Sequence, residues 1–265
     1  MYSSFQLAKK YCKYFITAKN GNGHGIHSPF VFDFVTKILN DKTPYHCYGN
    51  IESLRQGLLH DDTIINVDDF GAGSSAMPSR QRKIKDIARS SLKNKKFAQL
   101  LYRIARYYQP STVVELGTSL GITTCYLASA NERGHVYSFE GSGEIASTAN
   151  KNFEILELKN ITETVGNFDE TIFSTLTDAD RIDMAFIDGN HRKEPTLRYF
   201  DLLSKKSTAS SIFIFDDIHW SADMEEAWKL IQSSDPVTLS IDLFFIGLVF
   251  FNQDFKVKQH FTIRF

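Results

Sequence analysis

The stretch Val113-Val114-Glu115-Leu116-Gly117-Thr118-Ser119-Leu120-Gly121 joins a short β-branched, apolar run to a turn that holds two glycines. The apolar run predicts a strand, and the residues after the turn, 119–131, have the pattern of a helix. Gly117 lets a ligand approach the backbone because no Cβ stands in the way. The amides of residues 118–121 would be free donors at a helix N-terminus, where nucleotide ligands often bind.

Outward from this turn, strand-like and helix-like segments alternate. We expect further strands at 135–139, 161–165, 182–187 and 211–215, and helices at 97–108, 142–156 and 194–204. Such alternation is typical of right-handed βαβ units and a parallel sheet. Residues 237–251 and 257–265 are strand-rich without a clear helix between them, which suits antiparallel strands. The expected fold is α/β: a Rossmann-like, doubly wound, mainly parallel sheet with antiparallel C-terminal strands and a helical N-terminal extension.

The first 95 residues have a different pattern. Apolar residues recur at helical spacing from Phe5 to Phe15, and Ser28 followed by Pro29 is typical of the start of a second helix. Residues 68–75 form a polar, glycine-bearing loop that suggests a surface turn or a lid. We therefore expect two parts: a helical extension at 1–95 that covers the site or forms a dimer contact, and a catalytic domain at 96–265.

Composition and charge restrict the class of protein. The chain has 265 residues, 42% of them hydrophobic, and a net charge of −1, which suits a globular protein. No apolar run is long enough to span a bilayer, the N-terminus lacks the apolar core of a secretory signal, and the three cysteines form no Cys-x-x-Cys pair. We expect a cytoplasmic protein with reduced thiols and no membrane partner.

The charge is unevenly distributed along the chain. Residues 1–110 hold 17 Lys and Arg against 8 Asp and Glu, and residues 111–265 hold 13 against 23. Much of the positive charge lies at 79–96, where a solvated helix face, a lid over an acidic substrate and an RNA contact are all open readings. Because aromatic residues are almost absent there before Phe97, nucleic-acid binding is the least favoured of the three.

An acidic residue supports a nucleoside site at the glycine turn. Glu140 ends the second expected strand, 19 residues after Gly121, where a carboxylate can accept hydrogen bonds from both ribose hydroxyls. A dinucleotide site would need Gly-x-Gly-x-x-Gly to hold the pyrophosphate, and Glu115 would repel that group. A carboxylate at this place suits the amine of an amino-acid-bearing nucleoside. The alternative is a purely structural glycine turn.

The segment Glu115–Gly121 resembles the first motif of class I S-adenosylmethionine-dependent methyltransferases, in the form common among cation-dependent O-methyltransferases. The resemblance covers roughly residues 97–250. It implies that S-adenosylmethionine is the cofactor and that its binding residues are Glu115, Gly117, Thr118, Ser119, Gly121, Glu140, Gly166, Asn167 and Asp188.

Carboxylates follow two further expected strands. Asp188 comes after the run at 182–187, and Asp216 and Asp217 come after the run at 211–215. Three carboxylates at one sheet edge would repel one another unless a cation or protons intervened. A hard divalent ion with oxygen ligands, Mg²⁺ above all, would balance them. His191, three residues after Asp188, suits a general base because imidazole titrates near neutral pH.

The pattern Asp-Gly-x-His followed by Asp-Asp resembles metal-dependent sugar and macrolide O-methyltransferases. That resemblance implies that Asp188, Asp216 and Asp217 bind Mg²⁺ and that His191 is the base. The alternatives are that the aspartates cap turns, with Asp217 capping the next helix, and that His191 has a structural hydrogen bond. His219 and Trp220 could line the substrate site or simply pack.

The leading hypothesis is a Mg²⁺-assisted O-methyltransferase acting on a small hydroxylated substrate, with a homodimer left open. One rival keeps the methyl donor without the metal and methylates RNA or protein. Another is a non-catalytic cofactor-binding scaffold.

Overall fold

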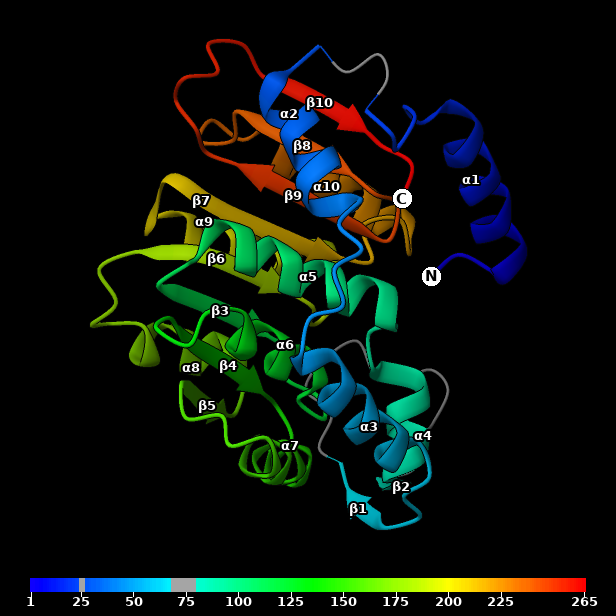
Figure 1. Cartoon of the computed structure of the whole chain (residues 1–265), viewed down its shortest axis with the longest axis vertical. Coiled ribbons are helices and arrows are strands. Elements are labelled where there is room, and N and C mark those ends of the chain that lie inside the picture. The colour runs from blue at the N-terminus through cyan, green and yellow to red at the C-terminus, as the bar shows by residue number, and fades with distance from the viewer. Residues whose placement is uncertain (24–26, 68–79) are drawn as a thin grey trace. The chain divides into compact units, whose positions relative to one another are not determined.

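The structure is a computed structural model that describes residues 1–23, 27–67 and 80–265 (Figure 1). The chain divides into two compact units. The first unit contains residues 1–41 and 181–265, and the second contains residues 42–180. The predicted loop at 68–75 and residue 79 of the basic stretch lie outside the described residues.

The second unit holds the glycine turn on a parallel sheet. Strands β3 (Thr112–Leu116), β4 (His135–Glu140) and β5 (Ile161–Val165) lie in that order and all pair in parallel. Helices α6 (Ile122–Ala130) and α7 (Gly143–Ile155) connect them, and α8 (Phe168–Thr175) follows β5. The expected strands and connecting helices are confirmed here. The helix after the turn begins at Ile122 rather than at residue 119, because Gly121 is its N-cap.

Helices precede this sheet along the chain. Helix α5 (Lys95–Tyr108) begins at an Asn94 cap, and α3 (Cys47–Leu59) and α4 (Ile84–Ser91) come before it. Strands β1 (Ile64–Asn66) and β2 (Gln81–Lys83), which the sequence did not predict, form a small antiparallel pair. A buried or half-buried set of tyrosine rings packs α3, α5 and α6 together: Tyr48, Tyr102 and Tyr126.

The first unit has its own sheet, with strand order β10-β8-β9-β7-β6. Strand β6 (Ile182–Ile187) runs parallel to β7 (Ser207–Asp216), with α9 (Lys193–Ser204) between them along the chain. Helix α10 (Ala222–Ser233) precedes β8 (Leu239–Asp242), β9 (Ile246–Phe250) and β10 (Gln259–Thr262). As predicted, β9 is antiparallel to β7 and β8. The prediction is wrong for β10, which is parallel to β8, because the chain reverses a second time after β9.

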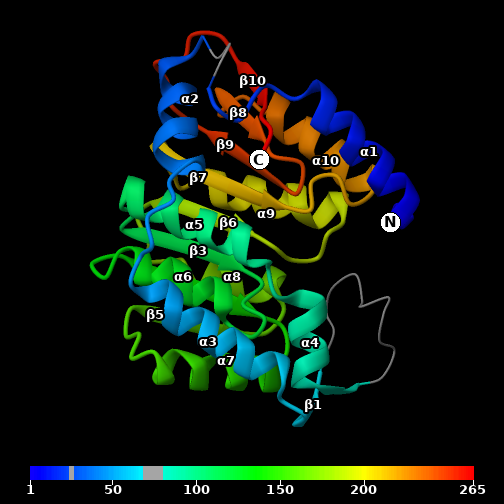
Figure 2. The ribbon, with the colours of Figure 1, turned by 45° about the vertical axis from the view of Figure 1, so that its right-hand side comes forward.

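The N-terminal segment of this unit is helical, as the sequence predicted. Helix α1 (Ser4–Thr17) begins with a Ser3 capping box, and α2 (Pro29–Phe34) has Ser28 as N-cap and proline in its first turn. A π-helical stretch, η1 (Val35–Leu39), continues α2. Figure 2 shows α1 beside α10, and hydrogen bonds from Tyr2 and Lys10 to Glu225 join the two helices.

The boundary between an extension at 1–95 and a catalytic domain at 96–265 stays a prediction, since the two compact units cut the chain elsewhere. Among the described residues, no helix is both long enough and apolar enough to cross a membrane.

Candidate active site

The glycine turn connects β3 to α6 through a tightly constrained backbone. Gly117 has φ 105° and Gly121 has φ 80°, values that favour glycine, and Ser119 also has a positive φ of 48°. The amides of Gly117 and Thr118 both donate to the carbonyl of Phe139 on β4, at 2.9 and 3.1 Å. The turn is therefore fixed against the end of the neighbouring strand.

Glu140 lies directly beside this turn. Its Oε2 accepts a hydrogen bond from the Ser119 amide at 2.8 Å, and its Oε1 accepts one from the Ser142 amide at 3.0 Å. The sequence predicted that Glu140 and the glycine turn belong to one site, and the structure brings them together. The carboxylate is held at the end of β4, where a ribose ligand is expected in this kind of sheet.

Glu115 is fully buried at the end of β3. Its Oε2 accepts hydrogen bonds from the hydroxyls of Thr124 on α6 and Ser138 on β4. Ser138 also lies 2.6 Å from the hydroxyl of Thr118. This buried network links β3, β4, α6 and the turn, so the structure gives Glu115 a role in holding the turn. That Glu115 also binds the donor's amine stays a prediction.

Gly166 and Asn167 follow β5. Gly166 has φ 136°, and its amide donates to the carbonyl of Glu140 at 2.8 Å, which brings the end of β5 next to the end of β4. Asn167 caps α8 by accepting from the Asp169 amide at 3.1 Å. Both predicted residues therefore lie at the same edge of this sheet as Glu140.

Sequence reasoning missed Glu163, which lies on β5 opposite Ser138 of β4. Burial raises the pKa of Glu163 to about 8, and the negative charges of Glu140 and Glu115 add to the shift. Its Oε1 is buried and has no hydrogen-bond partner among the described residues. A carboxylate inside the β-branched strand 161–165 was the available signal.

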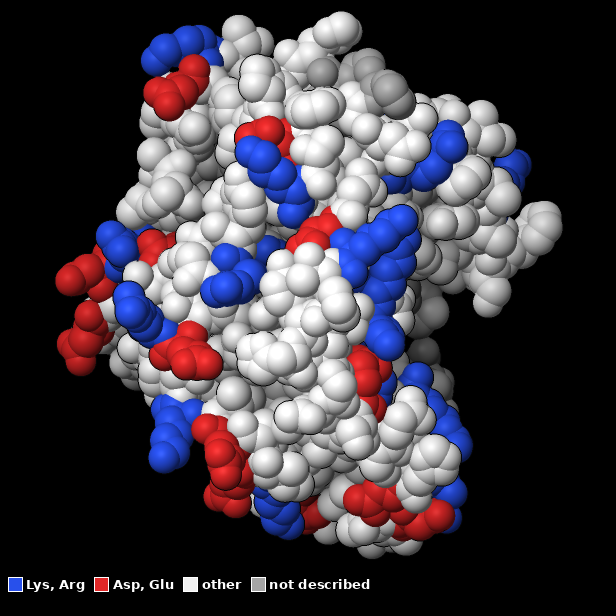
Figure 3. Space-filling model, in the orientation of Figure 1, with Lys and Arg blue, Asp and Glu red and all other residues white. Residues whose placement is uncertain are grey.

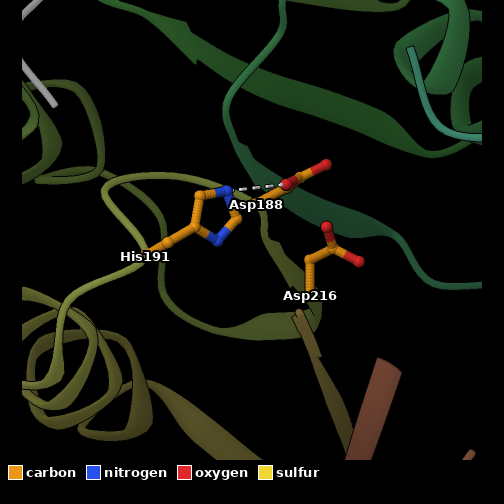
Figure 4. Close-up of side chains that lie close together, drawn as sticks. All are labelled: Asp188, His191 and Asp216. Atoms are coloured by element: carbon orange, nitrogen blue, oxygen red, sulfur yellow. Dashed lines mark ion pairs between the residues drawn. The ribbon is translucent and has the colours of Figure 1, made fainter. Parts of the chain in front are cut away.

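The first unit holds a group of side chains at the ends of β6 and β7. Asp188 follows β6 and Asp216 ends β7, and parallel pairing of Ile187 with Phe215 places both at one edge of this sheet. Ligand atoms of Asp188, His191 and Asp216 all lie within 4.8 Å of one another. Figure 4 shows the two carboxylates and the imidazole ring facing a common space.

The turn after β6 brings His191 back toward Asp188. Asn190 and His191 both have positive φ, 64° and 28°, which reverses the chain within a few residues. As a result the Nε2 of His191 lies 3.5 Å from Oδ1 of Asp188. The ring of Trp220 lies 5.6 Å from the imidazole ring, so Trp220 forms one wall beside His191.

These three side chains suit a divalent cation. Asp216 is only 2% exposed, and a buried carboxylate near a second carboxylate is stabilised by a cation or by a proton. Neighbouring ligands of an octahedral Mg²⁺ are about 3 Å apart and opposite ligands about 4.2 Å apart. Ligand atoms that lie within 4.8 Å of one another would therefore have to close by up to about 2 Å to share one cation. Asp188 and Asp216 supply the oxygen ligands that Mg²⁺ prefers, and His191 is close enough to act as a base or as a third ligand.

Asp217 is not part of this group of converging side chains in the described structure. Its backbone has a left-handed φ of 51°, and its amide donates to the carbonyl of Phe245 at 2.7 Å. The structure therefore brings together two of the three acidic residues predicted as ligands. Ser221, not Asp217, caps the next helix, α10.

His219 has a structural environment that the sequence did not reveal. Its Nδ1 lies 2.9 Å from Oε1 of Glu225, its Nε2 lies 2.8 Å from Oδ2 of Asp242, and its ring stacks on Phe244. Burial lowers the pKa of His219, but the hydrogen bonds and charges of Asp242 and Glu225 outweigh it and raise the pKa above its ordinary value. The ring thus ties the loop after β7 to α10 and β8.

Comparison with known proteins agrees with this geometry. Residues 114–218, which run from β3 past the end of β7, match the family model of a methyltransferase domain. No curated protein matches the sequence significantly. Residues 114–218 are therefore similar to a methyltransferase domain, which agrees with the resemblance of the glycine turn to class I S-adenosylmethionine-dependent methyltransferases.

Solved structures show the same fold. An O-methyltransferase from Bacillus cereus in complex with SAH is 18% identical, with a TM-score of 0.55 over 83% of this chain and 97% of that chain. The O-methyltransferase TomG from Streptomyces achromogenes, in complex with SAM, is 21% identical, with a TM-score of 0.53 over 61% and 82%. A SAH-bound methyltransferase from Podospora anserina is 10% identical, with a TM-score of 0.56 over 95% and 97%. The chain has the Rossmann-like fold of these methyltransferases.

Proposed function

We propose that this methyltransferase transfers the methyl group of S-adenosylmethionine to a hydroxyl oxygen of a small substrate, with Mg²⁺ held by Asp188 and Asp216 and with His191 as the general base. The observation that carries the proposal is the convergence of two carboxylates and one imidazole within 4.8 Å at strand ends of a methyltransferase domain. The O-methyltransferase names of two similar structures support oxygen as the acceptor.

In this proposal, different residues bind the donor, hold the cation and accept the proton. Glu140 and the glycine turn bind the nucleoside, and Asp188 and Asp216 hold the cation. A bound Mg²⁺ would hold the substrate hydroxyl and lower its pKa. His191 accepts the hydroxyl proton, the oxygen forms a bond to the methyl carbon, and the bond from that carbon to sulfur breaks. The demethylated cofactor leaves as a neutral thioether, and in-line placement of the two reactants supplies much of the rate.

Isothermal titration tests the binding half of the proposal. We expect S-adenosylmethionine to bind the wild type, and Mg²⁺ alone to bind with an affinity that EDTA abolishes. Asp188→Asn and Asp216→Asn should each lose Mg²⁺ binding, because an amide removes the charge that a hard cation requires. Asp217→Asn is the matched control and should keep it, since Asp217 lies outside the converging group. Donor binding without Mg²⁺ binding would refute the metal-assisted mechanism.

The role of His191 needs a separate experiment. Transfer of a radioactive methyl group from the donor to pooled small hydroxylated compounds measures turnover without a known substrate. We expect His191→Ala to reduce turnover by about 10²–10⁴-fold while donor affinity persists, which is the typical contribution of a general base. If His191 were a third metal ligand instead, the same variant would also lose Mg²⁺ affinity.

The rival in which a basic surface binds RNA receives less support from the structure. Lys83 and Lys85 both pair with Asp62, at 2.8 and 2.7 Å, and Arg89 lies 3.5 Å from Asp86. Basic side chains engaged in internal ion pairs are less available to phosphate. Methyl transfer to RNA by a metal-free wild type would favour this rival over the proposal.

A further inference from the structure

Helix α1 carries an apolar face that points away from the rest of its unit. Phe5 is 80% exposed, Ile16 is 77% exposed and Phe15 is 47% exposed. Ala8 and Cys12 are exposed as well, and at 100° per residue all five fall on one side of the helix. An exposed apolar stripe on a fixed helix is typical of an interaction surface.

The opposite side of α1 is already used for packing. Tyr14 is buried, and Leu7 and Tyr11 pack with it against Phe244. Lys10 reaches inward to Glu225 at 2.9 Å. Because these contacts fix the rotation of α1 about its axis, the five outward residues cannot turn inward without breaking them.

The charges around this stripe are basic. Lys9 and Lys13 are exposed and lie along one side of it, and α1 contains no Asp or Glu. At its C-terminal end, the guanidinium of Arg264 lies 4.3 Å from the ring of Phe15, and Lys19 is exposed nearby in the chain. Figure 3 shows blue and white atoms, and no red ones, over the visible face of α1.

We propose that this surface, the α1 outer face (Phe5, Ala8, Cys12, Phe15 and Ile16, with Lys9 and Lys13 at its side), binds an anionic lipid surface. A helix in a bilayer interface buries its apolar residues just below the headgroups and places its lysines against the lipid phosphates. The sequence predicted no membrane partner because it has no apolar run long enough to span a bilayer. A helix that lies in the bilayer interface does not need such a run. A second copy of the chain fits less well, because two outer faces in contact would bring lysines together and supply no carboxylate from α1.

Vesicle binding of the full-length protein tests this proposal. Cys12 is exposed, whereas Cys47 and Cys125 are buried, so an environment-sensitive thiol dye can be placed on the outer face selectively. We expect a blue-shifted emission and co-sedimentation with phosphatidylcholine vesicles that contain roughly one-third phosphatidylglycerol, and much weaker binding to pure phosphatidylcholine. Salt at about 1 M should weaken the binding, because it screens the lysines from the lipid phosphates.

Substitutions on the α1 outer face test whether this surface binds the vesicles. Phe5→Ser with Ile16→Ser should lower the partition coefficient at least about tenfold, because two exposed apolar side chains are lost. Lys9→Glu with Lys13→Glu should lower it at least as far for anionic vesicles, and this pair of exposed lysines keeps the proposal testable if the first variant fails to fold. Phe32→Ser, and Lys151→Glu with Lys229→Glu, change exposed residues outside α1 and should leave binding intact.

Two results would overturn the proposal. One is that the wild type does not bind anionic vesicles, or that the control variants lose as much binding as the α1 variants. The other is a concentration-dependent dimer in analytical ultracentrifugation that Phe5→Ser with Ile16→Ser abolishes, since this would assign the α1 outer face to a second copy of the chain. Neither result depends on methyl transfer.

Discussion

The geometry of the glycine turn between β3 and α6 depends on a single residue, Gly121. A Cβ at this position would lie 2.6 Å from the ring of Phe153 and 3.1 Å from Ala149, both on α7, and the backbone φ is +80°. We expect Gly121→Ala to destabilise the protein by about 1–3 kcal/mol and to weaken donor binding, because the turn must shift. Denaturant unfolding and donor titration measure both effects. Gly57→Ala, in helix α3 where a Cβ meets nothing within 4 Å, is the control and should leave donor binding unchanged and stability unchanged or up to about 1 kcal/mol higher.

The raised pKa of Glu163 predicts that the stability of the protein depends on pH. Its pKa of about 8 in the folded protein exceeds the ordinary value near 4.5, so the folded state holds a proton that the unfolded state releases between these pH values. Stability should therefore decline as pH rises from about 4.5 to 8. Glu163→Gln removes this decline, and we expect the variant to gain on the order of 1–3 kcal/mol over the wild type at pH 8, allowing for partial screening by solvent. Equal pH profiles in urea unfolding would contradict the assignment.

At the scale of elements, one carboxylate anchors helix α1. Glu225 on α10 accepts hydrogen bonds from Tyr2 and Lys10, and its Oε1 also lies 2.9 Å from His219. We expect Glu225→Ala to cost about 2–4 kcal/mol and to speed amide hydrogen exchange across residues 4–17, because three polar partners lose their acceptor. The surface pair of Lys37 and Asp33 provides the control: Lys37→Ala should change stability by less than about 0.5 kcal/mol.

The elements that the sequence predicted share a physical origin. The strands at 112–116 and 182–187 are mostly apolar and mostly buried, as expected for strands covered on both faces, and carboxylates at or near their ends identified the two site regions. Ser28 and Pro29 carry a local signal for a helix start, which the structure confirms. Short-range chemistry decides these features, so one sequence suffices to predict them.

Other features depend on contacts between distant residues. His219 is held by Asp242, 23 residues away, and no local pattern predicts that pairing. The grouping of His191 rather than Asp217 with Asp188 follows from positive φ angles in two separate turns. The same holds for the parallel direction of β10, which is set by pairing with β8 across an intervening strand of the chain.

At the scale of the whole molecule, the cation should couple binding to folding. Asp188 and Asp216 converge in the folded chain and separate on unfolding, so a cation that binds both stabilises only the folded state. At a Mg²⁺ concentration about 100 times Kd the gain is about 2.7 kcal/mol, which corresponds to a rise of several degrees in Tm for a chain of this size. Differential scanning calorimetry with Mg²⁺ and with EDTA measures it.

The variant Asp216→Asn sharpens that prediction, because it removes both the metal ligand and the repulsion from Asp188. We expect its Tm to be independent of Mg²⁺, and to lie above the wild-type Tm in EDTA, because the wild type then places two carboxylates close together in a site in which Asp216 is 2% exposed. With Mg²⁺ present, the wild-type Tm should instead lie above the Tm of the variant. A variant less stable than the wild type in EDTA would show that Asp216 stabilises the fold through other partners, and that the two carboxylates are already balanced without a cation.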